Sequence, residues 1–224
     1  MIAEAEREEY DAAAFFERML YLHVEQPLNV QDLTIAKFST MPGSEKAAAV
    51  LATPEVWRPF MPPLYNFIFT CIEVFLERHF IESYRGPDGR VYASTEEWIA
   101  DLSNFKASTT WPNKDAKDCI TRLFSFQRLP AVDVLYAAAL KGPLSAYPKF
   151  ELVKLMFDKR HLFTHRGGII DNKFLQKYND FHAQDPQEML PPPSVGKSAF
   201  LERSWVRDTL SEARAFVSFV GAAC

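Results

Sequence analysis

One short segment of the chain carries residues whose types and spacing could act on a phosphate ester. Arg160 is followed directly by His161, and a second histidine, His165, lies five residues after the arginine. Histidine titrates close to neutral pH, so an imidazole can take or give a proton. Arginine stays charged and offers a fork of donors that matches phosphate oxygens. These are the groups that RNA cleavage by its own 2′-hydroxyl requires: a base, an acid and a cation over the developing charge.

The element that must position these residues is predicted to be a helix over residues 147–166. Its apolar residues recur at helical spacing, and Gly167 and Gly168 end it. Residues five apart lie about 140° apart around an ideal helix, so Arg160 must reach around to act beside His165. His161 and His165, four apart, share one face.

The same pair of histidines offers an alternative chemistry, because a spacing of four on a helix can hold a transition metal. No glutamate of an HExxH pattern lies between His161 and His165, and no third ligand is identified from the sequence. We therefore predict no metal and no cofactor. His161 is expected instead to orient the site or to bind RNA.

The wider stretch FDKRHLFTHRGGIIDNKFLQKY, residues 157–178, resembles the ribonuclease motif of the HEPN superfamily. In that family an arginine is followed by Asn, Asp or His, then by a few mostly apolar residues and a histidine. Arg160, His161 and His165 occupy those positions here. The two glycines, two aliphatic residues and Asp171 that follow look like the variant found in many bacterial members. In helix order the resemblance covers about residues 57 to 220.

This resemblance implies an all-α fold, a HEPN-like helical bundle, with residues 1–56 as an N-terminal helical extension to the domain at 57–224. It implies a homodimer in which both motifs line one cleft. Arg160, His165 and His161 would be the catalytic residues, and RNA the substrate. The implied products carry a 2′,3′-cyclic phosphate and a 5′-hydroxyl. The implied setting is a bacterial toxin or antiviral defence module, with an antitoxin or defence-system protein as a further partner.

Four further residues are candidates for the substrate site. Lys159 and Arg166, with Lys154 beside them, could rim the cleft and supply local affinity for phosphate. Glu73, on an apolar helix upstream, resembles an acidic residue of the early helix in such domains. It would polarise a site histidine or contact the motif helix, although a glutamate on a helix is most often a solvated residue.

Two other functions remain open. The chain could be a catalytically inactive HEPN domain that binds RNA or nucleotide, or that assembles a larger defence complex. It could also be an unrelated helical adaptor, with Arg160 and His165 apart or on the outer surface. One departure bears on regulation: the toxin subtype controlled by a minimal nucleotidyltransferase has a tyrosine two residues after the motif histidine, where this chain has Gly167.

The rest of the chain also reads as helical, because apolar positions recur at helical spacing and alternating β-branched runs are almost absent. Pro27 is expected to end the first helix and RGPDGR to form a turn. The predicted helices are 3–24, 46–51, 64–84, a short one that begins at Ser94 or Thr95, 115–126, 131–141, 147–166, a short one at 171–178, and 200–220, with a loop at 182–198.

The composition and charge of the chain indicate which general class of protein it belongs to. Of 224 residues, 48% are hydrophobic and 24% charged, which is typical of a globular domain. The net charge of −4 argues against a protein that coats nucleic acid, so any contact with RNA must be local. The three separated cysteines fit a reducing cytosol. With an acidic N-terminus, and an apolar stretch at 59–72 broken by prolines, we expect a cytoplasmic protein with no membrane span.

Overall fold

The computed structural model describes residues 12–83, 100, 126–140, 142–184, 193–199 and 203–223. The helical elements in chain order are α2 (Ala12–Leu20), η1 (Tyr21–Glu25), α3 (Gln26–Thr40), α4 (Glu45–Leu51), α5 (Pro54–Trp57), η2 (Arg58–Phe60), α6 (Met61–Ser83), α9 (Leu129–Ala139), η3 (Leu144–Ala146), α10 (Phe150–His165), α11 (Asn172–Gln184) and α12 (Arg203–Ala223). Within the described ranges, extended pairing is limited to one isolated bridge, between Ile169 and Ser198. The all-α prediction is confirmed. The predicted turn at 85–90, the start of the short helix at Ser94 or Thr95 and the helix at 115–126 lie outside the described residues.

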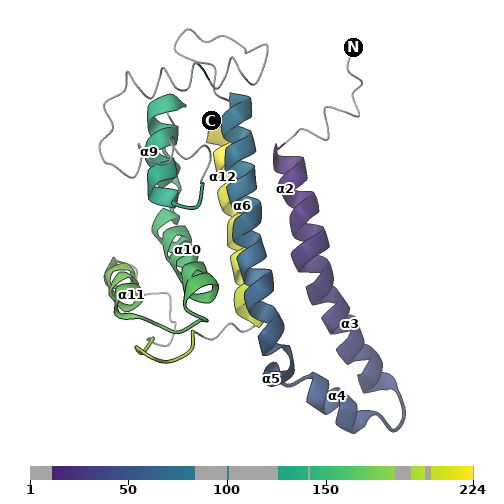
Figure 1. Ribbon diagram of the computed structural model, residues 1–224. Coiled ribbons are helices and arrows are strands. Elements are labelled where there is room, and N and C mark those ends of the chain that lie inside the picture. Colours follow the sequence, from purple (N-terminus) through teal and green to yellow (C-terminus); the bar gives the residue numbers. More distant parts are fainter. Residues whose placement is uncertain are drawn as a thin grey trace, which may run out of the picture.

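Helix α6 is the central element of the bundle (Figure 1). It packs against α2, α10 and α12. Its fully buried side chains are Tyr65, Ile68, Phe69, Ile72, Phe75, Leu76 and Phe80. Pro62 and Pro63 lie in its first turn, where a helix loses no amide hydrogen bond to proline. The helix predicted over 64–84 is thus confirmed, and it begins one turn earlier, at Met61.

The first described helix runs through a proline that we expected to end it. α2, η1 and α3 follow one another without a break from Ala12 to Thr40. In the π turn η1, the amide of Gln26 donates to the carbonyl of Tyr21, five residues back. In a regular α-helix the ring of Pro27 would clash with the carbonyl four residues before it. The wider π turn lies where that clash would fall, so the prediction of a break at Pro27 is wrong.

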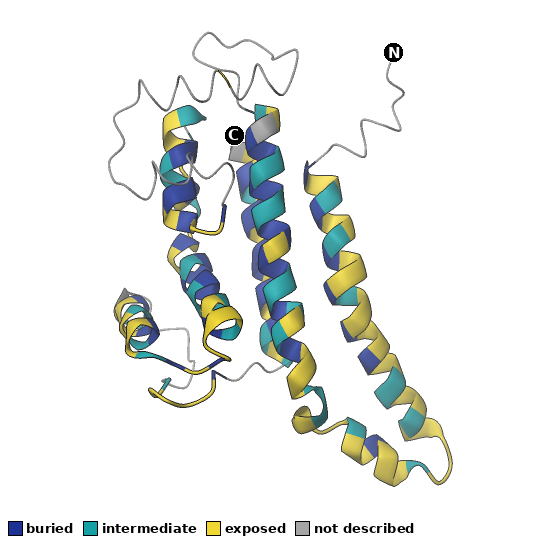
Figure 2. Cartoon of the chain, in the orientation of Figure 1, coloured by how far each residue is buried: buried dark blue, intermediate teal, exposed yellow. Residues whose placement is uncertain are grey.

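The hydrophobic core extends into the N-terminal region. Phe16, Leu20, Val24 and Leu28 are almost fully buried in the same cluster as α6. Beyond Leu28, most side chains of α3 and α4 are partly or fully exposed (Figure 2). Residues 12–28 therefore pack as part of the bundle, and the division into 1–56 and 57–224 stays a prediction from the sequence.

Ion pairs join the first and last described helices. Arg207 and Arg203 both pair with Asp32 on α3. Arg214 pairs with Glu17 on α2 over 3.0 Å and with Glu25 on η1 over 2.8 Å. The partners are separated by 171 to 197 residues along the chain. α12 is in this way fixed along the N-terminal helix as well as against α6.

Helix α10 is held against α6 by two contacts near its middle. The hydroxyl of Tyr65 donates to the carbonyl of Met156 over 3.0 Å. The rings of Phe69 and Phe157 meet edge to face, with centroids 4.7 Å apart. In the last two turns of α10, Phe163 also meets Tyr65 and Arg160 pairs with Glu73 of α6, whereas His161 and His165 are exposed.

The end of α10 and the start of α11 follow from local backbone chemistry. Gly167 and Gly168 adopt positive φ angles of 58° and 77°, and the amide of Gly168 donates to the carbonyl of Leu162 over 2.9 Å. Asp171 then accepts the amide of Phe174 over 2.8 Å, which caps the first turn of α11. The predicted stop at the two glycines is confirmed.

Helix α11 is longer than predicted. We expected a short helix ending at Tyr178 and a loop from His182, but α11 continues to Gln184. Its buried face is formed by Phe174, Tyr178 and Phe181, which recur at intervals of three and four. This apolar face keeps the segment on the bundle despite its polar composition, so the loop predicted at 182–198 begins too early.

The helical segment Pro54–Phe80 is long and apolar enough to cross a membrane, judged by length and composition alone. Inside the molecule, 44% of its apolar window is buried. The core helix of a soluble protein can have the same length and composition, so these two properties alone do not identify a membrane span.

Candidate active site

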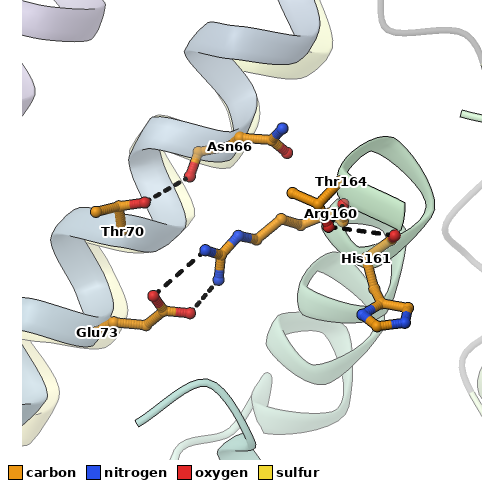
Figure 3. Close-up of polar contacts among 6 residues, drawn as sticks. All are labelled: Asn66, Thr70, Glu73, Arg160, His161 and Thr164. Carbon is orange, nitrogen blue, oxygen red and sulfur yellow. Dashed lines mark hydrogen bonds and ion pairs between the residues drawn. The ribbon is translucent and has the colours of Figure 1, made fainter. Parts of the chain in front are cut away.

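The sequence-predicted residues of α10 are distributed over three sides of the helix. In Figure 3 the guanidinium of Arg160 points toward α6, whereas the ring of His161 points away from α6. Lys159 instead contacts α12. The structure therefore does not bring all the candidate residues together. It groups them by the neighbouring helix that each one faces.

On the α6 side, Arg160 forms a two-pronged ion pair with Glu73. Its Nη1 donates to Oε1 and its Nη2 to Oε2, the second over 3.3 Å. The two side chains are only 16% and 12% exposed. Glu73 thus contacts the motif helix, one of the two contacts considered for it from the sequence. In this arrangement both outer nitrogens of Arg160 are engaged by the carboxylate.

The surroundings of this ion pair are largely shielded from solvent. Burial raises the pKa of Glu73, and the hydrogen bond and charge of Arg160 lower it in opposition. Two polar atoms beside the pair, the Nε of Arg160 and the Oδ1 of Asn66, are buried without a hydrogen-bond partner among the described residues. An unpaired buried polar atom destabilises a fold. Removal of either charge of this pair should therefore lower the stability of the protein strongly.

His161 and His165 lie together on the outer side of α10. Both are exposed, and their ring centroids are 4.4 Å apart. The pKa of His161 is lowered, first by partial burial, then by the charge of His165 and by Lys173 and Lys177, while Asp158 raises it. At neutral pH this imidazole is therefore held in its uncharged form, the form that can accept a proton.

Lys159 is directed to a different neighbour. Its ammonium lies 3.6 Å from the ring centroid of Trp205 on α12, a cation–π contact. Burial lowers the pKa of Lys159 to about 8. The prediction that Lys159 rims the same cleft as the two histidines has no support in this position, because the side chain packs between α10 and α12.

The side of α10 that faces α9 and α11 contains a pocket of about 930 Å³. His161 and Arg166 line it, and so does Lys154. Lys173 and Lys177 of α11 line it as well, and sequence reasoning missed both. They could have been noticed only if α11 had been predicted to fold back along α10, since their spacing alone is that of an ordinary solvated helix face.

Histidine and carboxylate are also metal ligands, so the two imidazoles of α10 would need further ligands nearby to hold a metal ion. Among the described residues, no group of three or more His, Cys, Asp or Glu side chains is placed to hold a metal ion. The two-histidine face of α10 thus offers two imidazoles without a third ligand from the described part of the same chain.

Comparison with known proteins identifies no relative. No protein-family model matches the sequence, and no curated protein or solved structure gives a significant match. Helix α10 presents two adjacent imidazoles to solvent, a paired arginine on the opposite side and a pocket with basic side chains next to His161.

Proposed function

We propose that this protein is a metal-independent endoribonuclease of the HEPN type, with its active site on α10. The observation that carries the proposal is the exposed pair His161 and His165, with ring centroids 4.4 Å apart, beside a pocket that contains lysines. Two imidazoles at this separation can hold the base and the acid that transesterification at a phosphate requires.

The proposed reaction needs no group beyond these side chains and the RNA. One imidazole takes the proton of the 2′-hydroxyl while its oxygen attacks the neighbouring phosphorus. The bond from phosphorus to the 5′-oxygen breaks, and that oxygen takes a proton from the other imidazole, which must be protonated. The products carry a 2′,3′-cyclic phosphate and a 5′-hydroxyl. The lowered pKa of His161 suits it to the role of base and leaves His165 as acid.

Arg160 is proposed to bind the phosphate, but it must share or exchange Glu73 to do so. Its two outer nitrogens are occupied by the carboxylate, and its Nε is buried. Pairing of two protomers about a two-fold axis would bring the α10 helices together and could open this ion pair. A homodimer is therefore part of the proposal.

The same ion pair favours a second candidate function, which is binding of RNA or nucleotide without cleavage. If Arg160 stays with Glu73, its charge is neutralised and cannot stabilise the transition state. In either case the proposed setting is cytoplasmic, in a toxin or antiviral defence module with an antitoxin or other protein partner.

The test is incubation of total RNA and of tRNA in EDTA with purified wild-type, Arg160→Ala and His165→Ala proteins. His23→Ala is a matched control, because His23 is an exposed histidine on η1. We expect wild type and His23→Ala to cleave and to leave cyclic phosphate ends, and the two other variants to lose at least about a hundredfold in rate.

Intact RNA in every lane, with RNA still bound in a filter or anisotropy assay, would replace the nuclease by the binding function. Equal cleavage by all four proteins would point to a contaminant and reject the site.

A further inference from the structure

The pocket between α9, α10 and α11 has the size of a site for a small ligand. Its volume of about 930 Å³ lies within the range of pockets that bind cofactors and nucleotides. Along α10 it extends from Glu151 to Leu162, a rise of about 16 Å over eleven residues. One end of the pocket therefore reaches the proposed active site, and the rest lies beside it.

Charged side chains of both signs line the pocket, including Arg128 and Asp180, and most of them pair with each other, as Arg166 does with Asp171. Lys177 pairs with Asp158, and Lys154 pairs with Glu151 over 2.7 Å. Lys173 is different: it is exposed, it lines the pocket, and no described carboxylate pairs with it. Its charge also reaches His161, whose pKa it helps to lower. Lys173 is thus a cation available to an anion that enters beside His161.

The remaining wall is formed by apolar and partly aromatic residues, most of which are largely buried and present only part of their surface to the pocket. The residues of this wall are Leu129, Pro130, Ala131, Leu155, Phe157, Leu162, Phe174 and Phe181. Ligand sites commonly combine such a surface with a few charged groups that fix orientation. A flat, apolar-faced group with a phosphate attached matches both parts of this pocket, and an inorganic anion alone matches only one.

We propose that this pocket binds one nucleoside phosphate unit, with the base against the apolar wall and the phosphate at Lys173. The inference rests on the proposed function in one respect, namely that the unit belongs to the RNA strand offered to His161 and His165. The shared chemistry is that of a nucleoside phosphate, which an RNA strand or a free mononucleotide can supply. The pocket gives the acidic molecule the local affinity for RNA that its net charge of −4 does not.

The experiment measures binding separately from cleavage. A fluorescent oligoribonucleotide with 2′-O-methyl groups at every position cannot be cleaved by transesterification, because it has no free 2′-hydroxyl. Its dissociation constant is measured by anisotropy, in EDTA and over a range of salt, for wild type and Lys173→Ala. Lys37→Ala, an exposed lysine on α3, is the matched control for loss of one positive charge.

We expect Lys173→Ala to weaken binding about threefold to tenfold and to reduce the salt dependence of log Kd by about 0.7, the share of one phosphate contact on a single strand. Lys37→Ala should bind as wild type does. Competition with a nucleoside monophosphate separates the two sources: displacement that depends on Lys173 means that a mononucleotide suffices, and displacement by the oligomer alone means that a strand is needed. Both results support the pocket.

Binding of the oligomer that is equal in wild type and Lys173→Ala, or absent in wild type, would overturn this inference. Such a result would leave the nuclease proposal standing if RNA is still cleaved with cyclic phosphate ends. Conversely, binding that depends on Lys173 without cleavage of unmodified RNA would reject the nuclease and keep the pocket.

Discussion

The most consequential single interaction is the ion pair of Arg160 with Glu73, because the sequence predicts a phosphate contact for this arginine and the structure gives it a carboxylate. Burial of such a pair removes water from both charged groups, which costs free energy. The attraction between the two charges offsets this cost only while both are present. Arg160 therefore has a structural role in joining α10 to α6, whatever it does in catalysis. A loss of activity in Arg160→Ala thus counts in favour of a catalytic role of Arg160 only after the folded fraction of the variant has been measured and used to correct the rate.

The stability of that pair can be measured by a double-mutant cycle. Glu73→Gln and Arg160→Gln should each lower the free energy of unfolding by about 2–4 kcal/mol, because each leaves one charge unpaired in a mostly buried place. The double variant should lose clearly less than the sum of the two. Urea denaturation of the four proteins gives the coupling. Additive losses would mean that the two side chains do not depend on each other.

The histidine pair leads to a prediction about pH. His161 acts as a base only when uncharged, so cleavage should fall as pH drops through its pKa, which is held below the usual 6.5 of histidine. Removal of the Lys173 charge raises that pKa, while His165, Lys177 and Asp158 still face the ring. In Lys173→Ala the acid limb of kcat should therefore move to higher pH and lower the rate at pH 6 about twofold.

This measurement is made with saturating RNA, so that weaker binding does not enter. Lys37→Ala should keep the wild-type profile. An acid limb unchanged in Lys173→Ala, or displaced to lower pH, would remove His161 from the role of base.

At the scale of elements, the helices could be predicted well where apolar spacing and capping residues agree. α6 and α10 are examples, and their predicted bounds differ from the observed ones by a few residues. The prediction failed at Pro27, because a π turn in the preceding residues accommodates the ring and no local signal announces such a turn. It also failed at the end of α11, where packing of Phe181 on the bundle outweighs a polar composition.

The candidate site was predictable only in part, because local patterns in the sequence do not tell which helices pack against each other. His161 and His165 share a face by spacing alone, and the structure places their rings side by side. The partners of Arg160 and Lys159 depend on which helices pack beside α10. The direction of each side chain around the helix could be calculated from the sequence. Trp205 lies on α12 and Lys173 on the neighbouring helix α11, and no local pattern predicts how these helices pack on α10.

The turn after α10 yields a prediction at this scale. Gly168 has a φ of 77°, and a Cβ built on it would lie 2.9 Å from the ring of Phe163, so Gly168→Ala should destabilise the protein by about 2–3 kcal/mol. Gly167 has a φ of 58° and open space around it. Gly167→Asn should cost less than about 1 kcal/mol, because asparagine tolerates this conformation.

Thermal unfolding of the two variants makes this comparison, with wild type as reference. Equal losses at both positions would contradict the additional cost assigned to the contact of Gly168 with Phe163.

At the scale of the whole molecule, the proposed dimer makes a prediction that a single chain cannot. If each site takes Arg160 from one protomer and His165 from its partner, a mixture of Arg160→Ala and His165→Ala proteins contains heterodimers with one intact site. After exchange of subunits the mixture should recover about a quarter of wild-type activity, although each variant alone is inactive. Activity is followed with fluorescent RNA, and light scattering reports the dimer.

A mixture as inactive as its components, in a preparation shown to exchange subunits, would place each site within one protomer. A monomer at micromolar concentration would contradict the dimer itself.

The ion pairs of α12 with the N-terminal helix also matter for how the chain is made. A ribosome releases α2 and α6 long before α12, which begins about 120 residues after α6 ends. At ordinary rates of synthesis this interval is on the order of ten seconds. During that time the acidic residues Glu17, Glu25 and Asp32 lack their arginines, and the apolar side of α6 lacks a cover. We therefore expect the nascent bundle to expose apolar surface that chaperones can bind until its last helix emerges.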